Sequence, residues 1–491
     1  MSSNFEKNFK RKDSALKNWM KTTLSVFLIA SLAGGVAACK DKKPDEKPVE
    51  QTTKAPEKLP EYQPAKMIES DPAVEELGTY EGVTALKIGE LTVLHKPIAA
   101  NQVVSAQLYL LGGSQRLGDK STGIERLALD VATSGGTEST PKDEFNTRLD
   151  SVGASIGSFN DRDYSGIAMK TIVPHFDDVW ELFTQTVLEP AMPEDVIELS
   201  RTRQLTQIAA IDEDADSQVS YLTTQTFFAG HPYAHIQLGT EEAVKSFTRD
   251  NLRAWQASLL QPENMLLVVS GSVPREKLVE KVKQSFGKLA PSGKKLPPLP
   301  ALDAGGPEIA FTQRELPTNY IFGMFQAPSP SHPDYPAMVV AMDYLGDRLF
   351  EEVRTKRNLT YAVSAGLSSR RANYGYLYVT AVDPETTLKV MLDQVEELKS
   401  KPLPKEALEQ TLNVYLTNFY MGQETNSSQA SALASAYIMT GDWKYAINLL
   451  EKLRAVTPEK IQEVTKKYVK NYHFGVVGPD ESKIPKELMK Q

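Results

Sequence analysis

An internal repeat is the feature that most limits how this chain can fold. Stretches starting at Ser246 and Ala455 share one pattern: a Thr at a helix N-cap position, acidic residues in the next turn, an amphipathic helix, a polar turn and a short apolar strand. The two capping residues, Thr248 and Thr457, are 209 residues apart. A Thr hydroxyl at this position accepts a bond from a free backbone N–H at the helix start. A period this long predicts a duplicated domain rather than a short-repeat solenoid.

The apolar spacing elsewhere mixes strands with helices. Leu91–Leu94 and Val103–Leu111 are apolar or alternate as paired strands do. Phe176–Val187 and Ala337–Phe350 have helical spacing. Because strands and helices do not alternate strictly along the chain, we expect an α+β fold with mainly antiparallel sheets packed with helices.

The length of 491 residues calls for at least two domains. Residues 291–307 are rich in Pro and Gly, which is typical of a linker. We therefore predict a first domain at 68–290 and a second, homologous domain at 308–491.

The N-terminal segment predicts a lipid anchor. The only cysteine, Cys39, follows a basic stretch (Lys7 to Lys21) and an apolar segment (Leu24 to Ala38). The sequence Val-Ala-Ala-Cys resembles the bacterial lipobox, in which the thiol carries diacylglycerol. The apolar segment is short for a membrane-spanning helix of about 20 residues. We expect residues 1–39 to be a lipoprotein signal peptide. The alternatives are an anchor helix and an ordinary secretory signal. Translation from Met20 would give a signal peptide of normal length.

A charged, proline-rich segment follows the cysteine. Residues 40–67 contain five prolines and few large apolar groups, which predicts a disordered tether. Lys40 follows Cys39 with no Asp that would signal retention in the inner membrane, so bacterial sorting rules favour the outer membrane, facing the periplasm.

The formal net charge of −8 disfavours nucleic acid as a partner.

Residues 123–137 read GIERLALDVATSGGT and have the spacing of an amphipathic helix. Four apolar residues at i, i+3, i+4 and i+7 form one buried stripe: Ile124, Leu127, Ala128 and Val131. Arg126 and Asp130, four residues apart, share another face.

This helix, its distance from the preceding strands and the following Gly-Gly-Thr resemble the pitrilysin family of zinc peptidases. The resemblance implies two homologous domains that form half of a clamshell. Active members carry His-x-x-Glu-His on this helix, in which both His bind zinc and the Glu activates water. Aligned here, these positions hold Arg126, Leu129 and Asp130. The third ligand, a Glu further along, aligns with Gln207, and a supporting Glu aligns with Ser200.

These replacements remove the metal chemistry. Arg does not ligate zinc, and Leu cannot take a proton from water. We therefore expect no metal or other cofactor in this chain and no catalytic residue acting alone. Arg126 and Asp130 are expected to pair across the vacant site.

A second motif matches the family closely. Residues 349–363 read LFEEVRTKRNLTYAV and resemble its C-terminal-domain signature, in which an Arg and a Tyr seven residues apart reach the substrate. Here they are Arg354 and Tyr361. The Arg fork can donate to peptide carbonyls, and the Tyr hydroxyl can donate to an oxygen that gains charge. The short Leu345-Gly-Asp-Arg348 segment departs from the family's Gly/Ser-rich loop.

These observations predict a zinc-free subunit of a heterodimeric peptidase. Its partner would carry zinc on His-x-x-Glu-His, and Arg354 and Tyr361 would bind and orient an unfolded peptide. An inactive scaffold or binding lipoprotein with the same fold is the first alternative. A peptidase with an unrelated active site is the second.

Overall fold

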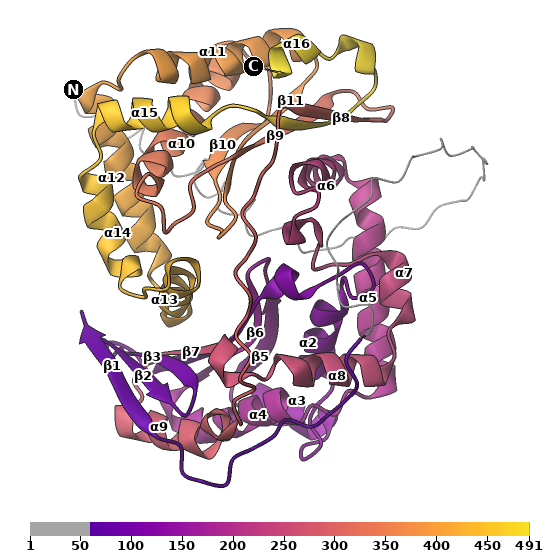
Figure 1. Cartoon of the computed structure of the whole chain (residues 1–491), viewed down its shortest axis with the longest axis vertical. Coiled ribbons are helices and arrows are strands. Elements are labelled where there is room, and N and C mark those ends of the chain that lie inside the picture. The colour runs from indigo at the N-terminus through magenta and orange to yellow at the C-terminus, as the bar shows by residue number, and fades with distance from the viewer. Residues whose placement is uncertain (1–58, 491) are drawn as a thin grey trace. The chain divides into compact units, whose positions relative to one another are not determined.

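The computed structural model describes residues 59–490, which form two β-sheets with helices packed on them (Figure 1). The first sheet has seven strands in the order β1-β2-β3-β7-β4-β6-β5, and only β3 and β7 pair in parallel. Its strands are β1 (Val74–Tyr80), β2 (Val83–Ile88), β3 (Leu91–Pro97), β4 (Val103–Leu111), β5 (Ser155–Asn160), β6 (Tyr164–Ile172) and β7 (Met265–Gly271).

The second sheet repeats this plan with five strands. Its order is β10-β11-β9-β12-β8, and only β12 and β8 pair in parallel. The order matches β5-β6-β4-β7-β3 of the first sheet, with the parallel pair in the same place. The strands are β8 (Glu308–Gln313), β9 (Asn319–Gln326), β10 (Val363–Leu367), β11 (Tyr374–Ala381) and β12 (His473–Gly478). The predicted α+β class with two similar, mainly antiparallel domains is confirmed.

The helices also follow the repeat. Those associated with the first half are α2 (Ile124–Ser134), α3 (Lys142–Ser151), α4 (Phe176–Leu188), α5 (Glu194–Glu213), α6 (Ala215–Phe227), α7 (Glu241–Ser246), α8 (Arg249–Leu259) and α9 (Arg275–Gln284). Those of the second half are α10 (Tyr335–Leu349), α11 (Pro384–Ser400), α12 (Lys405–Gly422), α13 (Asn426–Thr440), α14 (Tyr445–Arg454), α15 (Pro458–Tyr468) and α16 (Lys486–Met489).

The two repeated Thr residues cap equivalent helices. Thr248 accepts a bond from the N–H of Asn251 at the start of α8, and the Asn251 side chain returns a bond to the Thr248 N–H. Thr457 accepts from the N–H of Lys460 at the start of α15. Helix α8 leads into β7 and α15 leads into β12, as predicted from the sequence.

Each half also lends one helix to the sheet of the other half. Helix α6 packs on the second sheet, where Val219 contacts Val477. Helix α13 packs on the first sheet, where Leu433 lies in one apolar cluster with Leu94 and Val268. The opposite face of the first sheet holds the main core of that domain.

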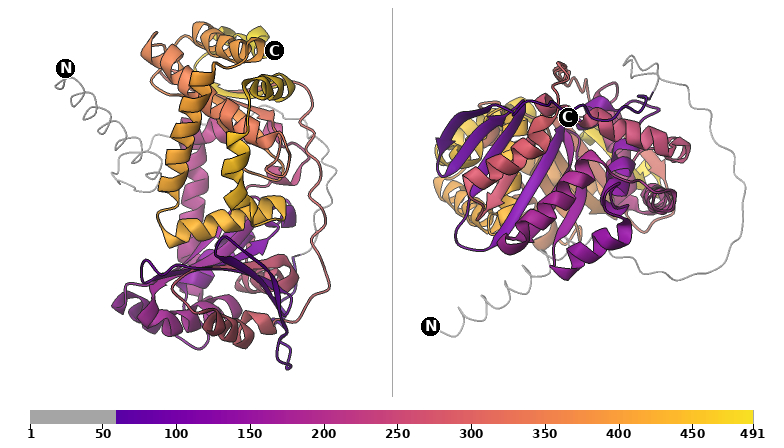
Figure 2. Two further views of the ribbon diagram at one scale, coloured as in Figure 1. Left: turned by 90° about the vertical axis from the view of Figure 1, so that its left-hand side faces the viewer. Right: turned by 90° about the horizontal axis from the view of Figure 1, so that it is seen from below.

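The segment predicted as the linker, 291–307, contains no helix or strand and runs as an extended chain (Figure 2). The amide of Gln115 donates to the Pro297 carbonyl at 2.5 Å, and the amide of Gln326 donates to the Leu302 carbonyl at 2.9 Å. The linker is thereby bonded to residues of both halves.

The last part of the predicted tether, residues 59–67, packs against the first domain instead of being disordered. Leu59 and Ala65 pack on the core of the first domain, Tyr62 lies 4.4 Å from the Arg253 guanidinium carbon, and Met67 bridges to Leu289. These apolar residues are spaced among prolines and charged residues without helical or strand periodicity, so the sequence pattern did not predict that they pack on the core. The predicted signal peptide with Cys39, and residues 40–58 of the predicted tether, lie outside the described residues. No helix in residues 59–490 is long and apolar enough to cross a membrane.

Candidate functional site

Helix α2 carries three of the four positions aligned with the metal site. The predicted stripe of Ile124, Leu127, Ala128 and Val131 is fully buried in the core of the first domain. Leu129 is equally buried, so it belongs to the core rather than to an open site. Arg126 and Asp130 are half-buried and face a pocket.

That pocket has a volume of about 250 Å³ and is built from three elements. Helix α2 contributes Arg126 and Asp130. The last three residues of edge strand β5 and one face of α5 complete it: Ser158, Phe159, Asn160, Ser200, Arg203, Gln204 and Gln207. The structure therefore brings three of the four aligned residues to one place, together with Ser200.

Arg126 has a different partner from the one expected. Its Nη2 donates to Oε1 of Gln207 at 2.8 Å. Within the described residues, no ion pair joins Arg126 to Asp130, which four-residue spacing alone had suggested. Burial lowers the pKa of Arg126, and the charge of Asp130 partly opposes that shift.

The residues of this pocket do not fit zinc. Asp130 is the only side chain in it that commonly ligates the metal, and two guanidinium groups repel a divalent cation. In residues 59–490, no group of three or more His, Cys, Asp or Glu side chains is placed to hold a metal ion. No reaction step through a metal can be derived for this chain.

Arg354 and Tyr361 form a second group at the end of α10. The Arg354 guanidinium carbon lies 4.7 Å from the ring centroid of Tyr361 and 4.8 Å from that of Phe350. Tyr361 is 82% exposed, which is unusual for an aromatic residue. The half-buried Arg354 side chain thus lies against two aromatic rings. Neither Arg354 nor Tyr361 lines the pocket beside α2.

A π-helical segment, η6 (Phe350–Thr355), carries Arg354. Such segments are rare and often mark functional sites. The wide turn follows α10 directly and precedes a positive φ of 51° at Asn358. It sets the direction in which the Arg354 side chain leaves the backbone.

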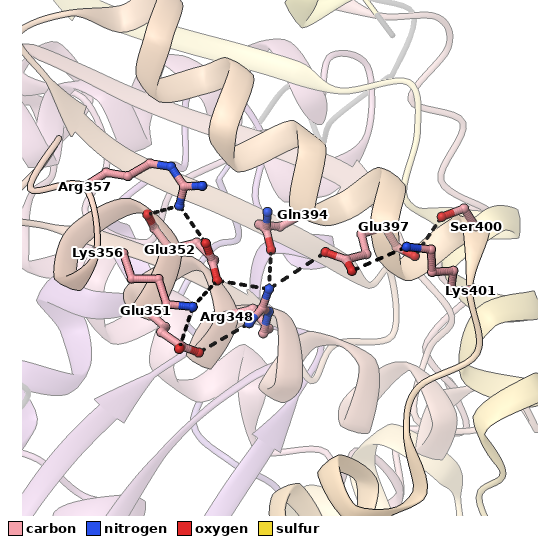
Figure 3. Close-up of polar contacts among 9 residues, drawn as sticks. All are labelled: Arg348, Glu351, Glu352, Lys356, Arg357, Gln394, Glu397, Ser400 and Lys401. Carbon is pink, nitrogen blue, oxygen red and sulfur yellow. Dashed lines mark hydrogen bonds and ion pairs between the residues drawn. The ribbon is translucent and has the colours of Figure 1, made fainter.

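Glu352 ties this segment together through a network of charges (Figure 3). Its carboxylate accepts from Lys356 Nζ at 2.7 Å and from Arg357 Nη1 at 2.6 Å, and it pairs with Arg348 Nη2 at 3.1 Å. Arg357 also donates to the Glu352 carbonyl at 2.8 Å. Hydrogen bonds from Lys356 and Arg357 lower the pKa of the buried Glu352 to about 2. The carboxylate therefore stays ionised and binds both ends of the turn.

Several residues of these two sites were not predicted from the sequence. Arg203 and Gln204 join Ser200 and Gln207 on one face of α5, and their spacing of three or four residues was a usable signal. The contributions of Phe350 and Glu352 depend on the π-helical turn, which no local pattern announces.

Two family profiles match this chain. The profile described as "Insulinase (Peptidase family M16)" matches residues 92–241, and that described as "Peptidase M16 inactive domain" matches residues 246–415. The chain belongs to peptidase family M16. The two matches follow each other along the sequence and extend into both domains of this M16 chain.

Its relatives include proteins of different kinds. An uncharacterised zinc protease of Mycobacterium leprae is 24% identical over 354 residues, which cover 69% of this M16 chain and 79% of the relative. Subunit 1 of the mitochondrial cytochrome b-c1 complex of Caenorhabditis elegans is 22% identical over 425 residues, covering 81% and 87%. The structure of the periplasmic protease PqqL from Escherichia coli matches with a TM-score of 0.72 and 16% identity, over 92% of this chain but 49% of PqqL.

Proposed function

We propose that this chain is the zinc-free subunit of a two-subunit M16 peptidase and that it binds and orients peptide substrates. The partner would be a second M16 subunit with zinc on His-x-x-Glu-His. The observation that carries the proposal is the pairing of Arg354 with the exposed Tyr361 in a chain whose own aligned metal positions do not fit zinc.

The Arg354–Tyr361 pair is poised to bind a ligand. Within the described residues, no hydrogen bond or ion pair engages the guanidinium of Arg354. Its central carbon lies 4.7 Å and 4.8 Å from the ring centroids of Tyr361 and Phe350, and the planar fork of N–H donors suits carbonyl or carboxylate oxygens. The accessible hydroxyl of Tyr361 adds a donor suited to a developing oxyanion.

The comparisons support a half-enzyme. This chain covers 49% of PqqL, so the PqqL protease has room for two such units in a single polypeptide. We infer that this chain reaches the same arrangement by pairing with a separate subunit. The "inactive domain" profile and the likeness to a cytochrome b-c1 subunit agree with a non-catalytic role.

We place the subunit at the bacterial cell envelope, lipid-anchored through Cys39 and facing the periplasm from the outer membrane. The support is the lipobox-like sequence before Cys39 and the charged residues 40–58 between it and the packed segment at Leu59.

A scaffold or binding lipoprotein without any role in proteolysis is the second candidate. It is favoured by the likeness to subunit 1 of the cytochrome b-c1 complex, which extends over 81% of this chain. In this case Arg354 and Tyr361 would contact a partner protein, and their loss would weaken assembly instead of slowing turnover.

The first experiment is a pull-down of the tagged, lipidated chain from native membranes, with mass spectrometry of the bound proteins. We expect a stoichiometric M16 subunit with an intact His-x-x-Glu-His. The reconstituted pair then receives Tyr361→Phe, which keeps the ring over Arg354 and removes the hydroxyl.

We expect Tyr361→Phe to lower kcat about 100-fold, the usual cost of losing an oxyanion donor. Tyr420→Phe is the matched control, because Tyr420 is 60% exposed and lies at the end of α12. Unchanged kcat in both variants would refute the catalytic role, and absence of any M16 partner would favour the scaffold.

A further inference from the structure

The pocket beside α2 holds buried polar groups that have no hydrogen-bond partner among residues 59–490. In this described part of the chain, the hydroxyl of Ser200 has no hydrogen-bond partner although the residue is only 2% exposed, and Nδ2 of Asn160 is buried without a partner. Both residues line the pocket. A buried donor without a partner destabilises the fold, so the unused donors indicate a missing partner.

The same pocket is rich in positive charge. Arg126 and Arg203 bring two guanidinium groups, and Asp130 brings one carboxylate. Within residues 59–490, Arg203 has no ion pair or hydrogen bond, and Arg126 bonds only to the neutral amide of Gln207. A partly buried guanidinium with a neutral partner has lost solvation that an anion would restore.

We propose that this pocket binds a carboxylate group of a peptide. The two arginines would take its oxygens, and Ser200 and Asn160 would supply further donors. A planar carboxylate matches the guanidinium fork, whereas Asp130 repels a dianion such as phosphate. A volume of about 250 Å³ accommodates a carboxylate with one small residue. The site where zinc ligands align thus becomes a second peptide contact, which needs neither the partner subunit nor Tyr361.

The test is isothermal titration calorimetry on the purified full chain in detergent, with no partner present. The probes are N-acetylated tetra-alanine with a free or an amidated C-terminus, and an amidated tetrapeptide carrying either Asp or Asn. Binding of the first probe alone would identify a terminal carboxylate, and binding of the Asp peptide would identify a side-chain carboxylate. Inorganic phosphate is expected to bind weakly or not at all.

We expect Arg203→Gln and Arg126→Gln each to weaken binding of the carboxylate probe at least about 10-fold. Arg203 is exposed, so its replacement leaves the fold intact and keeps the test valid if Arg126→Gln unfolds. Arg148→Gln on α3 is the matched control, since Arg148 pairs with Asp178 and Glu181 away from the pocket.

Equal affinity for acid and amide peptides, or unchanged binding in Arg203→Gln, would overturn the proposal. Neither Arg354 nor Tyr361 lines this pocket. The carboxylate site can therefore fail while the half-enzyme proposal stands, and the reverse also holds.

Discussion

The guanidinium of Arg371 donates from Nε to the fully buried carboxylate of Asp163 at 2.7 Å. Asp163 lies between β5 and β6, and Arg371 lies between β10 and β11, so the pair joins corresponding hairpins of the two domains. The neighbouring residues repeat the pattern, because Arg370 pairs with Asp161 at 2.6 Å. The duplicated hairpins have thus acquired opposite charges that bind them to each other.

Asp163→Ala should destabilise the protein by about 3–5 kcal/mol, because it leaves Arg371 and the buried hydroxyl of Tyr233 without their acceptor. Urea unfolding followed by tryptophan fluorescence measures the change. Asp177→Ala is the control: Asp177 pairs with Lys277 at 2.7 Å and with Lys281 at 2.9 Å but is 58% exposed, so its loss should cost less than about 1 kcal/mol. Similar costs for the two variants would contradict the structural role of Asp163.

Glu352→Gln should reveal how much the charge network around η6 contributes (Figure 3). The pKa of Glu352 is lowered from 4.5 to about 2, so the ionised carboxylate stabilises the fold above pH 4.5. We expect the variant to lose about 1–3 kcal/mol of unfolding free energy at pH 7. As pH falls from 4.5 towards 2, the wild type protonates and the difference should close. A pH-independent difference would rule out the ionised carboxylate as the cause.

Arg354→Gln should separate function from stability. Within residues 59–490, the interactions of the Arg354 guanidinium are those with the rings of Phe350 and Tyr361, so its loss should cost less than about 1 kcal/mol of unfolding free energy. In the reconstituted pair we expect kcat/KM to fall at least about 10-fold. Arg354→Lys, which keeps the charge without the fork, should recover only part of it. The control is substitution of Arg454 by Gln, because Arg454 is an exposed arginine at the end of α14. A large loss of stability in Arg354→Gln would contradict the assignment of Arg354 as a donor that serves a ligand rather than the fold.

Much of the fold could be predicted from local chemistry repeated at long range. Thr248 and Thr457 predicted equivalent helices because an N-cap hydroxyl accepts a hydrogen bond from a free backbone N–H in the first turn. The spacing of Ile124 to Val131 identified the buried face of α2 because helical geometry fixes which residues share a side. These signals depend only on neighbours in sequence.

What could not be predicted depends on contacts between distant segments. Arg126 bonds to Gln207, 81 residues away, instead of to Asp130 one turn along, and only the packing of α5 on α2 decides between them. The exchange of α6 and α13 between the two sheets likewise leaves no local pattern. The sequence around Leu59 and Ala65 predicts a tether, and only the packing of these residues on the core of the first domain shows otherwise.

The pocket beside α2 also allows a test by gain of function. The bond between Arg126 and Gln207 at 2.8 Å shows that these two side chains meet, and Asp130 lies one turn from Arg126 on the same face. Two His four residues apart on a helix, together with a Glu from a neighbouring helix, suffice to hold zinc. Arg126→His/Asp130→His/Gln207→Glu should therefore create a zinc site without altering the buried Leu129.

We expect the wild-type chain to bind no stoichiometric zinc in elemental analysis and its Tm to be unchanged by zinc or a chelator. Zinc should raise the Tm of the triple variant, by an amount equivalent to about 2.7 kcal/mol at 100 times Kd. Arg126→His alone is the control, because one added ligand cannot close the site. If the triple variant folds but binds no zinc, α2 and α5 do not meet as the structure has them. If the wild-type chain binds zinc tightly, the zinc-free half-enzyme is wrong.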